Sequence, residues 1–175
     1  MAKRKPAVPI ATPTPAPLPR ARVPQWAPVA ALAALALAVY ANSIGNGFIG
    51  DDQFQLLRNP LLRDFGSIPR IFGSSVWSFL GVTGNYYRPL QFLVYLFIAQ
   101  IAGLHAPAFH AFMVVLHAVN VALLYFFVRR MASGPIAWAS AALFAVHPIH
   151  TEPVDWIAAL PDLMLTATVL AGVLC

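Results

Sequence analysis

Charged residues and cysteine are both scarce in this sequence. Charged side chains make up 10% of the 175 residues, whereas soluble domains usually carry about 25%. So little polar surface excludes a water-soluble globule of this size, and together with a hydrophobic fraction of 59% it indicates a membrane protein. The single cysteine, Cys175, excludes an internal disulfide framework and a cysteine-based zinc site.

Acidic residues are absent from the basic, proline-rich start of the chain, residues 1–25. The basic residues there are Lys3, Arg4, Lys5, Arg20 and Arg22. A nucleic-acid patch would also be basic. Beside an apolar run, however, this pattern is typical of a topology signal that keeps the N-terminus in the cytoplasm, so we predict no nucleic-acid partner. The prolines break any helix, and we predict a disordered cytoplasmic tail.

Long apolar runs are what the sequence does contain. They predict membrane spans at about 26–43, 109–128, 135–149 and 160–175. A cleaved signal peptide would also fit the first run, but the long lead before it and the later apolar runs favour a retained span. The last run stops partway through a span, so we expect a truncated chain. The predicted fold class is an all-α polytopic membrane protein.

Residues 44–108 are predicted to form a large external first loop that carries amphipathic, juxtamembrane helices. The apolar run 88–104 within it is short. If this run spanned the membrane, Arg129 and Arg130 would lie outside, against the positive-inside rule, so we favour an interfacial position. The acidic residues that then share the outer face are Asp51, Asp52, Asp64, Glu152, Asp155 and Asp162. Two acidic segments that converge on one side favour a functional site.

Two short polar motifs in the external loop suggest chemistry. Asp51 and Asp52 follow a glycine-rich stretch. A carboxylate there suits a general base for a hydroxyl or a divalent-cation ligand, and a solvated loop pair is the third alternative. Arg88 follows Tyr86 and Tyr87. Its guanidinium suits a phosphate, which it holds through two parallel hydrogen bonds, and it equally suits a lipid headgroup beside interfacial tyrosines.

Three polar residues lie within one predicted span: His110, His117 and Asn120. Polar groups at membrane depth usually face the protein interior or a cavity. We favour interhelical hydrogen bonding over catalysis for these side chains.

The segment from His147 to Pro153 is unusually polar for the end of a span. Its two histidines and Glu152 invite a metal interpretation. Pro148 and Pro153 make a regular helix unfavourable, so a helical spacing of ligands cannot be assumed. We favour a rigid turn whose polar groups line a site.

Several separated motifs carry a family resemblance. They read YANSIGNGFIGDDQFQLLRNPLL, NYYRPLQFL, FHAFMVVLHAVN, LFAVHPIHTEPVDWI and PDLM. In this order, from about Tyr40 to about Leu165, they resemble the N-terminal membrane domain of transmembrane and tetratricopeptide-repeat O-mannosyltransferase-like proteins. That family belongs to the C-type glycosyltransferase superfamily.

The resemblance implies a polyprenyl-phosphate sugar donor and an inverting transfer, often to protein Ser or Thr. It places the catalytic base in the first external loop, at Asp51 or Asp52, and a donor-phosphate contact at Arg88. The residues it implies as lining the site are Tyr87, His147, His150, Glu152 and Asp162. Similar proteins commonly carry Gly-Arg where this chain has Ala159-Leu160, and often Asn at the position of Met113.

We therefore predict a membrane glycosyltransferase that moves a sugar to a hydroxyl acceptor on the external face. A non-enzymatic membrane scaffold or transport-associated module is the alternative, and a metal-dependent membrane hydrolase is a third. The predicted partners are the bilayer, a lipid-linked sugar and a protein or glycan acceptor, with no metal favoured. The predicted location is the inner membrane of a bacterium or the endoplasmic reticulum of a eukaryote. The 175 residues alone are expected to be inactive.

Overall fold

The computed structural model describes residues 24, 26–82 and 84–175. Within those ranges every regular element is helical, and long apolar helices are present, which confirms the predicted all-α polytopic class. The longer helices are α1 (Ala27–Tyr40), α3 (Pro89–Ala102), α4 (Ala106–Met131), α5 (Gly134–Val146) and α7 (Leu160–Leu174). The shorter α-helices are α2 (Ile68–Phe72) and α6 (Thr151–Asp155), and a π-helix covers Gln53–Leu57. The 3₁₀ turns cover Ala41–Gly45, Pro60–Leu62, Phe65–Ser67, Ser78–Leu80, Pro148–His150 and Ile157–Ala159. The predicted tail, 1–25, lies outside the described residues apart from Pro24.

Proline fixes where the long helices begin. A proline occupies the first or second position of α1, α3, α4, α5 and α7. The missing N–H costs nothing at a helix start, and the fixed φ of the ring favours the helical turn that follows. Proline therefore marks the start of each of these five helices.

Within the described residues, three helical segments are long and apolar enough to cross a membrane: Ala27–Gly45, Ala106–Met131 and Ile157–Leu174. The run 135–149, which was predicted as a span, is not among these three segments. Its helix, α5, ends at Val146 after 13 residues, which is about 20 Å at 1.5 Å per residue. A hydrocarbon core is about 30 Å thick, so α5 is shorter than predicted, because Pro148 ends the helix.

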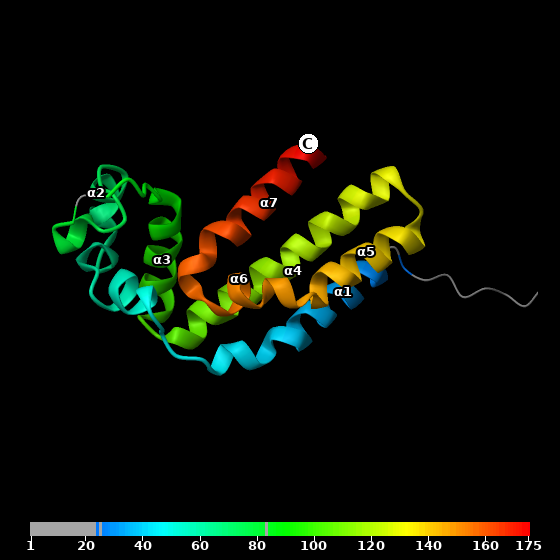
Figure 1. Ribbon diagram of the computed structural model, residues 1–175, viewed down its shortest axis with the longest axis horizontal. Coiled ribbons are helices and arrows are strands. Elements are labelled where there is room, and N and C mark those ends of the chain that lie inside the picture. Colours follow the sequence, from blue (N-terminus) through cyan, green and yellow to red (C-terminus); the bar gives the residue numbers. More distant parts are fainter. Residues whose placement is uncertain (1–23, 25, 83) are drawn as a thin grey trace, which may run out of the picture.

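The helix α4 lies at the centre of the bundle and packs against α1, α5 and α7 (Figure 1). Small side chains allow α1, α4 and α5 to approach closely. Ala137, Ala141 and Ala145 lie four residues apart on one face of α5 and are fully buried against Leu32 and Ala36 of α1 and against α4. Small residues at such spacing are typical of helix interfaces in membranes.

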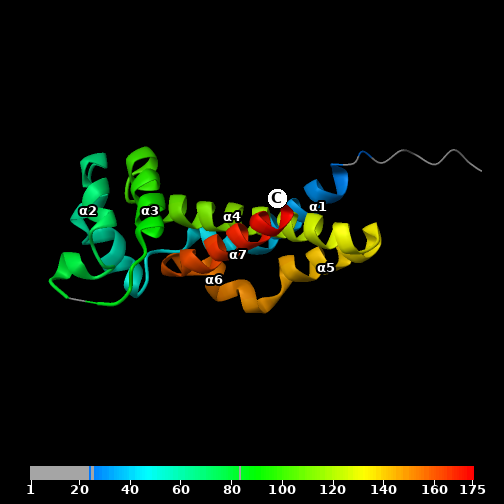
Figure 2. The ribbon, with the colours of Figure 1, turned by 90° about the horizontal axis from the view of Figure 1, so that it is seen from above.

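The helix α3 does not run with the bundle. Figure 2 shows it standing across the direction of α4, next to α2, at one end of the long helices. At this same end α1 leads into the Asp51 loop, and α6 leads into α7 (Figure 1). The last turn of α4, which contains Arg129 and Arg130, lies at the other end. There the Arg130 guanidinium donates to the Val173 carbonyl oxygen near the end of α7 (3.4 Å).

Polar side chains of α4 bind backbone carbonyl groups of other segments. The predicted interhelical hydrogen bonds form for His117 and Asn120, whereas His110 contacts a loop. The contacts are His110 Nε2 with Gly47 O (3.4 Å), His117 Nε2 with Ala145 O (3.3 Å) and Asn120 Nδ2 with Leu163 O (3.0 Å). All three α4 side chains are fully buried. They fasten α4 to the loop after α1, to α5 and to α7.

Candidate active site

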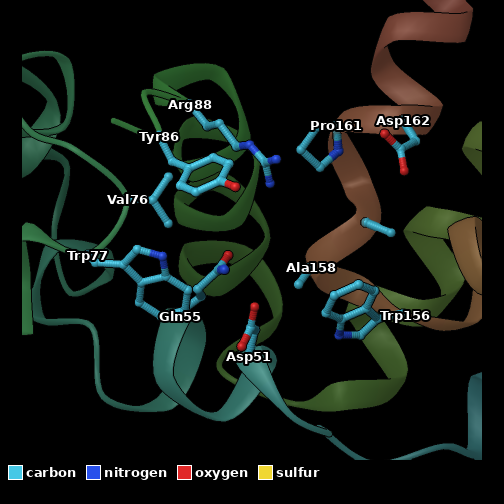
Figure 3. A pocket seen from close by; sticks show the side chains of 11 residues that line it. Asp51, Gln55, Val76, Trp77, Tyr86, Arg88, Trp156, Ala158, Pro161 and Asp162 are labelled. Atoms are coloured by element: carbon cyan, nitrogen blue, oxygen red, sulfur yellow. The ribbon is translucent and has the colours of Figure 1, made fainter. Parts of the chain in front are cut away.

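Asp51 and Asp52 have different surroundings although they are adjacent in sequence. Asp52 is fully buried. Its Oδ1 accepts a hydrogen bond from the Ala158 backbone N–H (2.8 Å), and its Oδ2 accepts one from the Ile49 N–H (3.3 Å). Asp51 is partly exposed, and its side chain points into a cavity (Figure 3).

One of the two bonds to Asp52 joins segments that are far apart in the chain, and the other, from Ile49, is local. Ala158 lies in the turn before α7, so its bond ties the Asp51 loop to the second acidic segment. Burial raises the pKa of the Asp52 carboxyl above its usual value, and the hydrogen bonds from Ile49 and Ala158 oppose that rise. Because the Asp52 carboxylate is fully buried and Asp51 is partly exposed at a cavity, the two carboxylates are poorly arranged to share a divalent cation.

Local backbone geometry explains why the two carboxylates diverge. Gly50 has φ +51°, in the left-handed region that glycine adopts easily. The chain then turns at once into the short helical stretch that continues as the π-helix Gln53–Leu57. Consecutive side chains on such a turn point in different directions, so Asp52 faces the core while Asp51 faces outward.

Described residues around Asp51 line three neighbouring cavities. The first, called the arginine cavity here, has a volume of about 280 Å³. Its polar residues come from three separate segments: Asp51 and Gln55, then Arg88, and finally Asp162. Figure 3 shows the Arg88 guanidinium and the Asp51 carboxylate reaching into the same space from opposite sides. The guanidinium lies 5.3 Å from the centre of the Tyr86 ring, a cation–π contact that orients it.

A second cavity, the apolar groove, begins where the arginine cavity ends. It has a volume of about 310 Å³ and lies between α3 and α7. Its lining residues are Tyr87, Arg88, Pro89, Leu90, Gln91, Pro161, Met164, Leu165 and Thr168. Arg88 lines both spaces, so the groove runs from the guanidinium along one face of a spanning helix.

The third cavity, the acidic cavity, lies on the other side of Asp51 and has a volume of about 1080 Å³. One wall is the loop after α1, and the other is the segment from Pro148 to Trp156. Its acidic lining residues are Asp51, Glu152 and Asp155. Asp51 and Trp156 line both this cavity and the arginine cavity, so they form the boundary between the two.

The predicted site residues thus fall into two groups. Asp51, Arg88, Tyr87, Glu152 and Asp162 line one or more of the three cavities. The Tyr87 hydroxyl, however, is engaged with the Phe72 carbonyl oxygen (2.7 Å).

The second group lines none of these three cavities, and it comprises Asp52, which was predicted as a catalytic candidate, His147 and His150. The His147 Nδ1 accepts the Ile149 N–H (3.2 Å) and so caps a 3₁₀ turn. The His150 ring packs on Phe144 with ring centres 4.1 Å apart. Burial, and to a smaller extent the neighbouring His147, lowers the pKa of His150, which disfavours its charged form.

A buried hydrogen-bond network behind the arginine cavity was not predicted. Gln91 Nε2 of α3 donates to Gln55 Oε1 (3.1 Å) and lies 2.7 Å from the Tyr95 hydroxyl. The Tyr95 hydroxyl donates to the Ile157 carbonyl oxygen (2.8 Å). The network therefore fixes the π-helix and the turn before α7 against α3. The sequence signal for it is a pair of polar residues four apart in an apolar run, which places both on one helix face.

The fold and the cavities together define a polytopic α-helical membrane protein whose acidic and basic side chains converge at one end of its spans. Curated relatives support a narrower class. The chain is 36% identical to Protein O-mannosyl-transferase Tmtc2 of Drosophila melanogaster over 134 residues, which are 74% of the chain and 14% of that protein. It is 33% identical to human Protein O-mannosyl-transferase TMTC1 over 148 residues, 79% of the chain and 17% of that protein.

Against mouse Protein O-mannosyl-transferase TMTC2, identity is 32% over 146 residues, 81% of the chain and 18% of that protein. The chain belongs to the transmembrane and tetratricopeptide-repeat O-mannosyltransferase-like family. It spans 14% to 22% of the lengths of the curated relatives it matches. No family model and no solved structure matches it.

Proposed function

We propose that the full-length protein is a membrane glycosyltransferase that moves a sugar, mannose by analogy with the names of its relatives, from a polyprenyl-phosphate donor to a protein hydroxyl. The observation that carries this proposal is the position of Asp51. Its carboxylate lies between the arginine cavity, which Arg88 lines, and the acidic cavity, which has no Lys or Arg among its described lining residues.

The donor fits the arginine cavity and the groove that continues from it. A phosphate near Arg88 would receive charge-assisted hydrogen bonds. The sugar would occupy the arginine cavity, and the isoprenoid chain would follow the apolar groove beside α7. Apolar surface next to a phosphate-binding cation matches the two halves of such a donor.

The acceptor hydroxyl would approach from the acidic cavity, on the far side of Asp51 from Arg88. Asp51 takes the hydroxyl proton as the oxygen bonds to the anomeric carbon, and the bond from that carbon to the phosphate oxygen breaks. The polyprenyl phosphate leaves with the electron pair, and Arg88 stabilises its growing negative charge. Attack and departure on opposite faces of the sugar invert the anomeric configuration.

The arrangement of the helices supports an external site. The Asp51 loop and α6 lie at one end of the bundle, and the arginines of α4 lie at the other, near the start of α1 (Figure 1). A basic N-terminal tail in the cytoplasm then puts the cavities on the outer face of the membrane.

Arg88→Ala in the full-length protein tests the donor assignment. It should raise the KM for a polyprenyl-phosphate sugar and lower kcat, because the lost cation serves both the bound phosphate and the departing one. Arg88→Lys should recover part of both, since it keeps the charge without the two parallel hydrogen bonds. Arg70→Ala removes an exposed arginine of α2 outside the cavities and is the matched control. Normal transfer by Arg88→Ala would overturn the donor assignment, whereas no transfer by the wild-type full-length protein would favour the non-enzymatic scaffold.

A further inference from the structure

We propose that the acidic cavity selects the acceptor, and that its preferred acceptor is an extended polypeptide segment with Lys or Arg beside the reacting hydroxyl. This inference rests on the proposed function, because it names the second substrate of the same site. It adds a specificity that the transfer reaction itself does not require.

The distribution of charge decides which cavity serves which substrate. Among the described residues that line the three cavities, Arg88 is the one arginine or lysine, and it lines the arginine cavity and the apolar groove. The anionic donor therefore belongs there. The acidic cavity offers carboxylates alone as charged groups among its described lining residues, and it would repel a phosphate.

The carboxylates of the acidic cavity are available to a ligand. Glu152 is exposed, and no described Lys or Arg lies in the cavity wall to neutralise it. Asp155 is partly exposed, but its Oδ1 is buried and has no hydrogen-bond partner within the described part of the chain, so this oxygen adds negative charge to the wall and no direct contact. With Asp51 these groups form a negative field around the position where the acceptor hydroxyl must enter. Such a field attracts a cationic neighbour of that hydroxyl and repels an acidic one.

The size and apolar surface of the cavity favour a polypeptide over a second sugar. Its volume, about 1080 Å³ against about 280 Å³ for the arginine cavity, lies just above the usual range for small-molecule sites. Ile49 and Ile149 stand on its two walls with 57% and 68% of their surfaces exposed, and Trp156 lies at its inner boundary. Aliphatic walls around a polar centre suit side chains of an extended chain on both sides of a Ser or Thr.

The test compares matched peptides as acceptors for the purified full-length protein. Three peptides share one sequence with a single Thr, and the residues on each side of the Thr are Lys, Gln or Glu. Transfer is measured from polyprenyl-phosphate mannose, and binding of fluorescently labelled forms of the same peptides is measured without donor. We expect kcat/KM to fall in the order Lys, Gln, Glu, with about tenfold between the first and last, as several partly exposed charge pairs allow.

Two isosteric variants locate the preference. Glu152→Gln and the double variant Glu152→Gln, Asp155→Asn should bring the ratio between the Lys and Glu peptides stepwise toward one, in transfer and in binding. Asp64→Asn is the matched control, because it removes an exposed carboxylate of the same loop that lines none of the three cavities. It should leave the ratio as in the wild-type protein.

Each outcome separates the inference from the function on which it rests. Transfer to all three peptides with equal kcat/KM, or a preference that survives the double variant, overturns the inference and leaves the glycosyltransferase intact. Preferential binding of the Lys peptide that the double variant abolishes, without any transfer, supports the cavity and overturns the proposed function. Equal binding without transfer overturns both. Transfer to a glycan acceptor but to no peptide would overturn the polypeptide assignment.

Discussion

Asp52→Ala and Asp51→Asn should fail in different ways, because the two carboxylates are held differently. Asp52 binds the backbone N–H groups of Ile49 and Ala158 and is fully buried. Asp51 is partly exposed at the boundary of two cavities. We expect Asp52 to act as a positioning residue that fixes the Asp51 loop, and Asp51 to act as the base.

The magnitude for Asp52→Ala follows from the two groups it leaves unpaired. A buried N–H without an acceptor costs about 1–3 kcal/mol. The Ala158 bond is short and buried, so its loss belongs in that range, whereas the Ile49 bond is longer and partly buried and should contribute less. We expect Asp52→Ala to destabilise the protein by about 2–4 kcal/mol. Asp52→Asn keeps one acceptor oxygen for Ala158 and should cost roughly 1–2 kcal/mol.

Asp51→Asn should instead leave stability almost unchanged, within about 0.5 kcal/mol, as for other substitutions away from buried contacts. Its transfer rate should fall by about a hundredfold to ten-thousandfold, which is the usual worth of a general base. The donor KM should change little, since the amide keeps the shape of the carboxylate.

The assay pairs thermal unfolding with transfer kinetics for the full-length protein in detergent. Asp52→Asn should retain more transfer activity than Asp52→Ala, because the asparagine still accepts the hydrogen bond from Ala158. The reasoning would be refuted if Asp51→Asn unfolded at a markedly lower temperature with near-normal turnover. Equal stability of Asp52→Ala and the wild-type protein would equally rule out the proposed clamp.

Three further outcomes are expected. Burial raises the pKa of the Asp52 carboxyl above 3.8, so the folded protein keeps that proton at pH values where the unfolded chain has lost it. The free energy of unfolding of the wild-type protein, relative to that of Asp52→Asn, should therefore fall as pH rises from about 3.8 to the pKa of Asp52 in the folded state, and it should level off above that pKa. Thermal unfolding measured over this pH range tests the trend. Cysteines placed at Ser75 and Glu152 in a cysteine-free background should both react with a membrane-impermeant reagent added from outside. Labelling at position 75 with protection at position 152 would mean that α3 spans the membrane. Leu165→Trp should raise the KM of a long-chain donor more than that of a short-chain one by narrowing the apolar groove, while Val169→Trp, outside the groove, should not.

The sequence by itself predicted much of this molecule because its strongest signals are local. Apolar runs predict spans from hydropathy alone, and the prolines at helix starts mark where the runs begin. The acid of the first loop and Arg88 were also predicted as site residues, since charged groups beside spans are rare enough to attract notice. The length of α5 was overestimated, because hydropathy continues past Val146 while Pro148 ends the helix.

Only the tertiary structure separated Asp51 from Asp52. No periodicity distinguishes two adjacent identical residues, and the difference depends on a hydrogen bond from Ala158, 106 residues along the chain. The same holds for the cavities, whose walls combine the Asp51 loop, the start of α3 and the turn before α7. It also holds for His150, whose ring packs on Phe144 instead of lining them. Which side chain faces a cavity is set by the packing of segments far apart in sequence, and that packing is decided by the whole fold.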